Sequence, residues 1–145
     1  MAEAIRVLMV EDNRGDVVLM QEAIRRAGVA YRVSVIQDGV EAVEYLLRRG
    51  RYAGVPSPDL IVLDLKIPRK GGREVLADIH ADEKLGKIPV VILSSSVSEL
   101  ELARAQIGPS QACMPKPTTF PGYVDMVLAI EAFRLAVGKG KLQGS

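Results

Sequence analysis

The chain has 145 residues, of which 48% are hydrophobic and 26% are charged, as is usual for one globular domain. Its 19 Lys and Arg residues nearly balance 18 Asp and Glu residues, so no net field favours binding to nucleic acid or to a membrane surface. A single cysteine excludes an internal disulfide, and no apolar run approaches the roughly 20 residues that span a bilayer. Because the first residues also lack a secretory pattern, we expect a cytoplasmic protein.

Short apolar runs and amphipathic runs alternate from the start of the chain. Residues 5–10 are mostly apolar and predict a buried strand. The next run, 15–28, predicts a helix that ends at a glycine, and its apolar residues at helical spacing are Val18, Leu19, Ala23 and Ile24. A second strand is predicted at 32–36, and a second helix, which begins at a capping aspartate, at 38–50.

A turn-rich loop at 50–58 separates these elements from the rest of the chain. The remaining strands are predicted at 59–65, 89–94 and 111–114. The remaining helices are predicted at 72–86, 97–106 and about 121–137. We expect one domain over 1–138 and a disordered tail over 139–145, so that no second domain carries an output function.

The alternation of five strands with five helices predicts an α/β fold. Its parallel five-stranded sheet would be doubly wound, with helices on both faces. Sheets of this kind bind ligands beyond the carboxyl ends of their strands. The functional residues are therefore expected at that edge.

Polar residues lie at the carboxyl ends of four of the predicted strands. Glu11 and Asp12 stand at the end of the first strand, Asp64 and Ser94 at the ends of the third and fourth, and Lys116 follows the fifth. Carboxylates gathered at one edge would raise one another's pKa unless a cation lies among them. Mg²⁺ prefers this kind of oxygen donor and commonly binds beside a phosphate, so the pattern predicts a Mg²⁺ site.

A phosphoryl-acceptor site fits the same set of residues. Aspartate is an established nucleophile for forming an aspartyl-phosphate, and Asp64 lies in the middle of the predicted sheet. Lys116 offers a positive charge to a phosphoryl group, and Ser94 offers a hydroxyl donor.

The motifs that carry these residues resemble the receiver domain of bacterial two-component response regulators. In chain order they read VEDN, LIVLDLKIP, RKGGREVL, IPVVILSSS and PKP. The resemblance covers residues 5–135 and is closest to the single-domain regulators that serve phytochrome histidine kinases. It implies a flavodoxin-like (βα)5 fold with the strand order 2-1-3-4-5.

The resemblance also implies roles for individual residues. Asp64 would receive a phosphoryl group from a histidine of a partner kinase. Asp12 and Asp64 would bind Mg²⁺, together with the backbone carbonyl of Lys66 and, through water, Glu11. Lys116 would pair with the phosphoryl group, and its peptide bond to the following proline would be cis.

Two positions of the expected switch differ from the commonest pattern of the family. Ser94 stands where threonine is commoner, which keeps the hydroxyl that would bond the phosphoryl oxygen. Cys113 stands where a tyrosine or phenylalanine usually rotates inward on activation. A thiol cannot act by a ring rotation, so we expect Ser94 to signal through loop and helix shifts, and Cys113 to be a small buried side chain.

The last predicted helix is more apolar than one buried face requires. The residues responsible are Met126, Ile130, Phe133 and Val137. We expect part of this apolar surface to be exposed. The chain would then form a homodimer through the last helix and its neighbouring elements.

These observations predict a stand-alone response regulator and not a metabolic enzyme. It would catalyse its own Mg²⁺-dependent phosphorylation and dephosphorylation, and would signal by protein contact or as a phosphorelay intermediate. The expected partner is a histidine kinase, and the resemblance implies a bacteriophytochrome. Two alternatives stay open: a pseudo-receiver that binds partners without phosphorylation, and an aspartate-dependent phosphohydrolase, which Lys66 disfavours because it stands where that class carries a second acid. His80 is expected at the surface without a partner.

Overall fold

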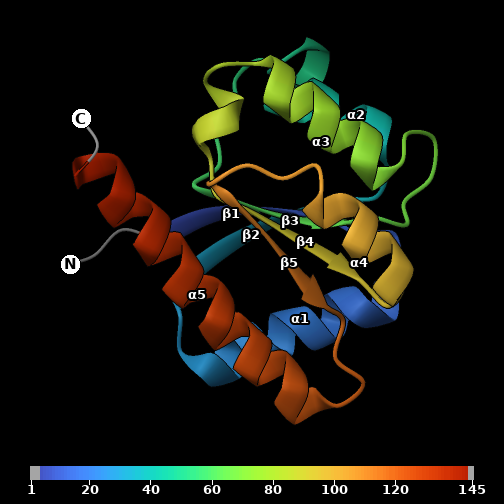
Figure 1. Ribbon diagram of the computed structural model, residues 1–145, viewed down its shortest axis with the longest axis vertical. Helices are drawn as coiled ribbons and strands as arrows, with labels where there is room; N and C mark the ends of the chain where they lie inside the picture. Colours follow the sequence, from blue (N-terminus) through green and yellow to red (C-terminus); the bar gives the residue numbers. More distant parts are fainter. Residues whose placement is uncertain (1–3, 144–145) are drawn as a thin grey trace.

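Five parallel strands form the centre of the computed structural model, which describes residues 4–143 (Figure 1). In chain order they are β1 (Ile5–Val10), β2 (Tyr31–Ile36), β3 (Leu60–Asp64), β4 (Val90–Ser94) and β5 (Gln111–Pro115). The spatial order is β2-β1-β3-β4-β5, and every neighbouring pair is parallel. The predicted fold class and strand order are both confirmed.

Helices cover both faces of this sheet (Figure 1). They are α1 (Arg14–Ala27), α2 (Gly39–Leu46), α3 (Gly72–Ala81), α4 (Val97–Arg104) and α5 (Phe120–Gln143), with short 3-10 turns at η1 (Gly50–Tyr52) and η2 (Leu85–Lys87). The core under α1 and α5 is separate from the core under α2, α3 and the buried side of α4. Strands buried on both faces explain why β3 and β4 read as uninterrupted apolar runs.

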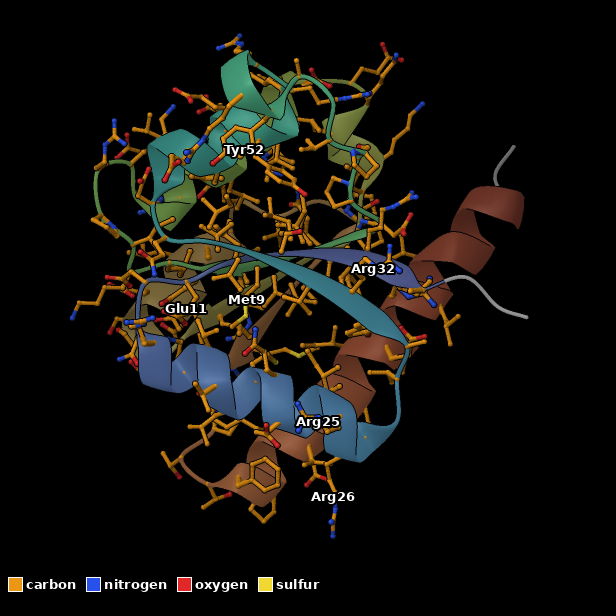
Figure 2. The ribbon with its side chains drawn as sticks, turned by 180° about the vertical axis from the view of Figure 1, so that it is seen from behind. Met9, Glu11, Arg25, Arg26, Arg32 and Tyr52 are labelled. Carbon is orange, nitrogen blue, oxygen red and sulfur yellow. The ribbon has the colours of Figure 1, made fainter. Side chains whose placement is uncertain are left out.

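The alternation of side chains along β1 divides its residues between the two cores. Leu8 and Val10 pack under α2 and α3, whereas Val7 and Met9 pack toward α1 and α5. Figure 2 shows Met9 pointing into the second layer, with Glu11 at the end of the strand beside the start of α1. The strand therefore delivers Glu11 to the carboxyl edge of the sheet.

The buried face of α1 differs from the predicted one. Ala23 is buried and Ile24 is partly buried, as expected, but Val18 is 56% exposed and Leu19 is 37% exposed. Met20 takes part in the core instead. Only one stripe of a helix can face the sheet, and residues 18 and 19 lie outside that stripe.

The last helix is longer than predicted, and its exposed apolar residues are different. It ends at Gln143 instead of near residue 137, so part of the expected disordered tail is helical, while residues 144 and 145 lie outside the described part. Met126 and Ile130 are buried in the core, and the large exposed apolar side chains of the helix are Phe120 at its start and Leu128 and Leu135 further along. The predicted helices 38–50 and 72–86 are too long, because α2 and α3 end earlier and 3-10 turns follow. Within residues 4–143, no helix combines the length and the apolar character that crossing a bilayer requires.

Candidate functional site

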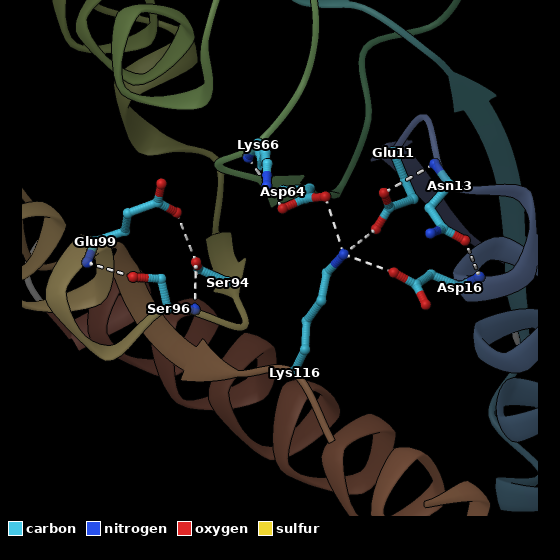
Figure 3. A network of polar contacts seen from close by, with 9 residues as sticks. All are labelled: Glu11, Asn13, Asp16, Asp64, Lys66, Ser94, Ser96, Glu99 and Lys116. Carbon is cyan, nitrogen blue, oxygen red and sulfur yellow. Dashed lines mark hydrogen bonds and ion pairs between the residues drawn. The ribbon is translucent and has the colours of Figure 1, made fainter. Parts of the chain in front are cut away.

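The carboxyl edge of the sheet holds a hollow of about 610 Å³. All of the predicted site residues except Cys113 line it: Glu11, Asp12, Asp64, Lys66, Ser94 and Lys116. They lie at or just after the carboxyl ends of four different strands, which parallel pairing brings together. Figure 3 shows all of them except Asp12. The sequence-based expectation that these residues converge is therefore correct.

Lys116 is the centre of the charged cluster in this hollow. Its Nζ lies 2.7 Å from Asp16 Oδ2, 2.8 Å from Glu11 Oε1 and 3.0 Å from Asp64 Oδ2 (Figure 3). Its backbone N–H donates to the carbonyl of Ser94 at 2.9 Å, which fixes the start of the side chain against β4. One ammonium group thus holds three carboxylates from three different parts of the chain.

Asp16 is a site residue that the sequence analysis missed. It lies in the first turn of α1, where acidic residues are common because they interact favourably with the helix dipole. Asn13 caps this helix by accepting the N–H of Asp16 at 3.0 Å, which turns the start of α1 toward the hollow. The only signal in the sequence was its place one helical turn after Asp12.

One lysine faces three carboxylates in this cluster, and the pKa values of its members reflect both burial and this excess of acids. Burial and the neighbouring Asp64 carboxylate raise the pKa of Glu11 to about 7, against the opposing effect of Lys116. Burial lowers the pKa of Lys116, but its three carboxylate partners outweigh burial and leave this pKa above the ordinary lysine value. Lys116 therefore stays charged, and Glu11 binds a proton more readily than an ordinary glutamate does.

The donor set fits a hard divalent cation. Carboxylate oxygens of Glu11, Asp12 and Asp64 all lie within 4.8 Å of one another, and they come from buried, exposed and buried side chains respectively. Three carboxylate oxygens around a site with one open side suit a hard cation such as Mg²⁺ or Mn²⁺ better than they suit a soft metal ion. Lys66 borders the same hollow, and its backbone N–H donates to Asp64 Oδ1 at 3.1 Å.

The loop after β3 is shaped by close backbone contact. A Cβ atom at Gly72 would lie 2.5 Å from the Cα of Leu65 and 2.7 Å from the carbonyl oxygen of Asp64. No side chain can occupy that space, so glycine at the start of α3 allows the loop to close against the end of β3. This contact holds the backbone around Asp64.

Ser94 and Cys113, the two predicted switch residues, are in different surroundings. Ser94 is buried; its hydroxyl donates to Glu99 Oε2 at 2.8 Å and accepts the backbone N–H of Ser96 at 3.0 Å (Figure 3). Cys113 is half-buried in β5 beside Ile92, and burial raises the pKa of its thiol. Cys113 is thus a small, partly buried side chain packed against the core, less covered than the buried side chain expected.

Two smaller expectations need correction. Residues 4–143 contain no cis peptide bond, so the bond from Lys116 to Pro117 is trans, the isomer that proline also favours by a small margin. His80 is exposed as expected, but its Nε2 lies 2.7 Å from Oε1 of Gln111. Gln111 begins β5, at the end of the strand away from the hollow, so this contact is structural.

Known proteins are similar to this chain in sequence and in fold. The sequence matches the response regulator receiver domain over residues 7–127. Response regulator Rcp1 of Synechocystis sp. (strain PCC 6803) is 35% identical over 129 residues, which are 89% of this chain and 88% of Rcp1. The structure of the phosphorylated cyanobacterial phytochrome response regulator RcpA is 38% identical, with a TM-score of 0.81 over 92% of this chain and 95% of RcpA. The Mn²⁺-bound form of Rcp1 is 32% identical, with a TM-score of 0.77 over 89% and 93% of the two chains. The chain therefore belongs to the response regulator receiver domain family.

Proposed function

We propose that this response regulator accepts a phosphoryl group from a phosphohistidine of a partner kinase on Asp64. The observation that carries the proposal is the position of the Asp64 carboxylate. It is buried at the end of the central strand β3, 3.0 Å from the Lys116 ammonium, and it borders a hollow with space for a phosphoryl group. Asp64 is thus the acidic residue best placed to act as the nucleophile.

The transfer would exchange one phosphorus bond for another. A carboxylate oxygen of Asp64 attacks phosphorus, the bond from phosphorus to the histidine nitrogen breaks, and the imidazole leaves with the bonding electron pair. The Lys116 ammonium already lies beside Oδ2 of Asp64, and it would stabilise the negative charge of the phosphoryl oxygens during the transfer. The Ser94 hydroxyl, on the neighbouring strand, then donates to one of those oxygens.

The residues that would hold Mg²⁺ are Asp12 and Asp64, with Glu11 acting through a water molecule and Lys66 through its backbone carbonyl. When bound, Mg²⁺ would neutralise charge that develops on the phosphoryl group. The cluster of carboxylate oxygens supports this assignment, as does the Mn²⁺-bound form of Rcp1. Asp12 is exposed, so it faces the direction from which a hydrated ion arrives.

Acetyl phosphate and intact-mass measurement test the acceptor directly. In the presence of Mg²⁺ the wild-type chain should gain one phosphoryl group, and the Asp64→Asn variant should gain none. A wild type that gains no mass would favour the alternative, a pseudo-receiver that binds partners without phosphorylation. An Asp64→Asn variant that gains as much as the wild type would contradict the assignment of the acceptor.

The names of the relatives support a phytochrome histidine kinase as the partner. RcpA is described as a phytochrome response regulator, and we extend that pairing to this chain. An autophosphorylated bacteriophytochrome should transfer its label to the wild type within a short incubation, whereas a histidine kinase of an unrelated pathway should transfer slowly. Equal rates from the two kinases would leave the pairing without support.

A second copy of the chain is the proposed occupant of the outer face of α5. Leu128 is 49% exposed and Leu135 is 48% exposed, and Ala132 lies exposed between them at helical spacing. Burial of this stripe against its copy would remove apolar area from water. Sedimentation should show a dimer that Leu128→Glu disrupts, and a monomeric wild type at high concentration would contradict this proposal. From the phosphorylated dimer, the signal would pass on by contact with another protein or by onward phosphoryl transfer.

A further inference from the structure

The start of α4 contains an unusual hydrogen-bonded cap. Ser96 is the N-cap residue, and its hydroxyl accepts the backbone N–H of Glu99 at 3.3 Å. In a regular capping box, the glutamate at this third helical position accepts the backbone N–H of the N-cap residue in return. Here the N–H of Ser96 donates to Ser94 Oγ at 3.0 Å instead, and the Ser94 hydroxyl donates to Glu99 Oε2 at 2.8 Å. The Ser94 side chain is therefore inserted into the box (Figure 3).

In this arrangement the hydroxyl proton of Ser94 is donated to Glu99, although the phosphorylated state needs the same proton for a phosphoryl oxygen. A serine hydroxyl carries one proton and can donate only one strong hydrogen bond. As long as that proton points to Glu99, Ser94 cannot donate to a phosphoryl oxygen on Asp64. Phosphorylation must therefore exchange one acceptor of the hydroxyl for another.

The exchange leaves no buried polar group without a partner. Once Ser94 turns to the phosphoryl group, the Glu99 carboxylate can close the regular capping box on the N–H of Ser96. Both arrangements satisfy the same groups, which is the requirement for two states that differ little in free energy. The carboxylate also stays at the N-terminus of α4, where the helix dipole favours negative charge.

We propose that Glu99 is a positioning residue for Ser94 and carries the phosphorylation signal to the first turn of α4. This inference rests on the proposed phosphorylation of Asp64. It explains how the domain signals with Cys113 where many relatives have an aromatic ring: a hydrogen-bond exchange replaces a ring rotation. Val97 follows the cap directly and is 67% exposed, so a change in the cap takes place beside a surface that a partner can reach.

Backbone amide NMR with Mg²⁺ and beryllofluoride, a mimic of the phosphoryl group, tests this inference. In the wild type, the amide resonances of Ser96 and of the first turn of α4 should shift on addition of beryllofluoride. Glu99→Ala should bind beryllofluoride but lose the shift at Ser96, since no carboxylate can close the box. Glu99→Gln should keep the shift, because its amide oxygen still accepts. Glu101→Ala is the matched control: Glu101 is exposed on the same helix, and its variant should respond as the wild type does.

Ser94→Ala gives an independent readout that does not depend on substitution at Glu99. Without the inserted hydroxyl, the regular box should form at once, so the Ser96 amide should already resonate near its activated position and move little on addition of beryllofluoride. A Glu99→Ala or Ser94→Ala variant with the full wild-type shift would overturn the role of Glu99. A wild type that binds no beryllofluoride would instead contradict the proposed phosphorylation, so the two failures are distinguishable.

Discussion

Two charged clusters in this domain each contain a glutamate beside a basic side chain, but the pKa values of the two glutamates are shifted in opposite directions. One lies at the carboxyl edge of the sheet, where Lys116 faces three carboxylates. The other joins α5 to β2. There Arg134 forms two hydrogen bonds, of 2.7 and 2.8 Å, with Glu131, and Glu131 also accepts the Tyr31 hydroxyl at 2.9 Å.

The difference between the clusters is the balance of charge. Arg134 and Glu131 form a one-to-one pair, and the pKa of Glu131 is lowered because Arg134 outweighs the effect of burial. At the carboxyl edge the acids outnumber the lysine, and burial together with the Asp64 carboxylate raises the pKa of Glu11 to about 7. The α5 cluster is complete and stabilises the fold, whereas the other holds an excess of negative charge. Such an excess suits a divalent cation, which could in turn neutralise charge on a phosphoryl group.

Removal of the Lys116 ammonium should have the largest effect. In Lys116→Ala the three carboxylates lose the cation that pairs with them, and the proposed phosphoryl group loses the charge that would stabilise its oxygens. We expect phosphorylation by acetyl phosphate to slow by about 100- to 1000-fold, the usual effect of losing one preorganised electrostatic donor. Time-resolved intact mass at saturating Mg²⁺ measures the rate. A rate within a few-fold of the wild type would contradict the role of Lys116.

Removal of Arg134 should affect stability and leave phosphorylation unchanged. Arg134→Met leaves the partly buried Glu131 without its cation, which should lower the free energy of unfolding by about 1 to 2 kcal/mol. Urea denaturation measures this as a lower midpoint at unchanged slope. Arg25→Met is the matched control, since the Arg25–Glu22 pair is exposed and its loss should not be measurable. A slower phosphorylation of Arg134→Met would show that the two clusters are coupled.

The sequence predicts the two clusters to different extents. Asp12, Asp64 and Lys116 could be predicted because each follows a strand, and parallel pairing alone brings strand ends together. Asp16 and Glu99 could not, because each lies in the first turn of a helix, where an acid needs no functional reason.

The contacts that helices make with the sheet also could not be predicted from the sequence. The Tyr31–Glu131 bond joins residues 100 positions apart, and it depends on the exact rotation of α5 over β2. The same rotation decides that Met126 is buried and Leu128 is exposed. In a helix that is apolar on several sides, the pattern of residues does not determine which side faces the sheet.

Neutralisation of one acid in each cluster should change stability in opposite directions. Glu11→Gln removes one of the crowded charges, so the metal-free domain should become more stable by about 1 kcal/mol near pH 8. Glu131→Gln removes the partner of Arg134 and should be destabilising. Urea midpoints in the presence of a chelator give both values. Loss of stability in Glu11→Gln would show that Glu11 contributes more through its bonds to Lys116 and Asn13 than it costs through repulsion.

The last effect expected is a pH dependence of stability that the two clusters impose with opposite signs. The folded-state pKa of Glu11, about 7, lies above its unfolded value of 4.5, so its contribution to stability is complete below pH 4.5 and is lost as the pH rises toward 7. The folded-state pKa of Glu131 is lowered, so its contribution is present above its ordinary pKa and is lost as the pH falls through the folded value. Of these two glutamates only Glu11 should titrate between pH 5 and pH 7.5, and the metal-free wild type should lose stability relative to Glu11→Gln over that range. Urea midpoints of the two proteins at both pH values measure the difference.

Saturating Mg²⁺ should abolish this difference in stability, because the ion takes the place of the proton among the carboxylates. A difference that persists with Mg²⁺ would place the titrating group outside the metal site.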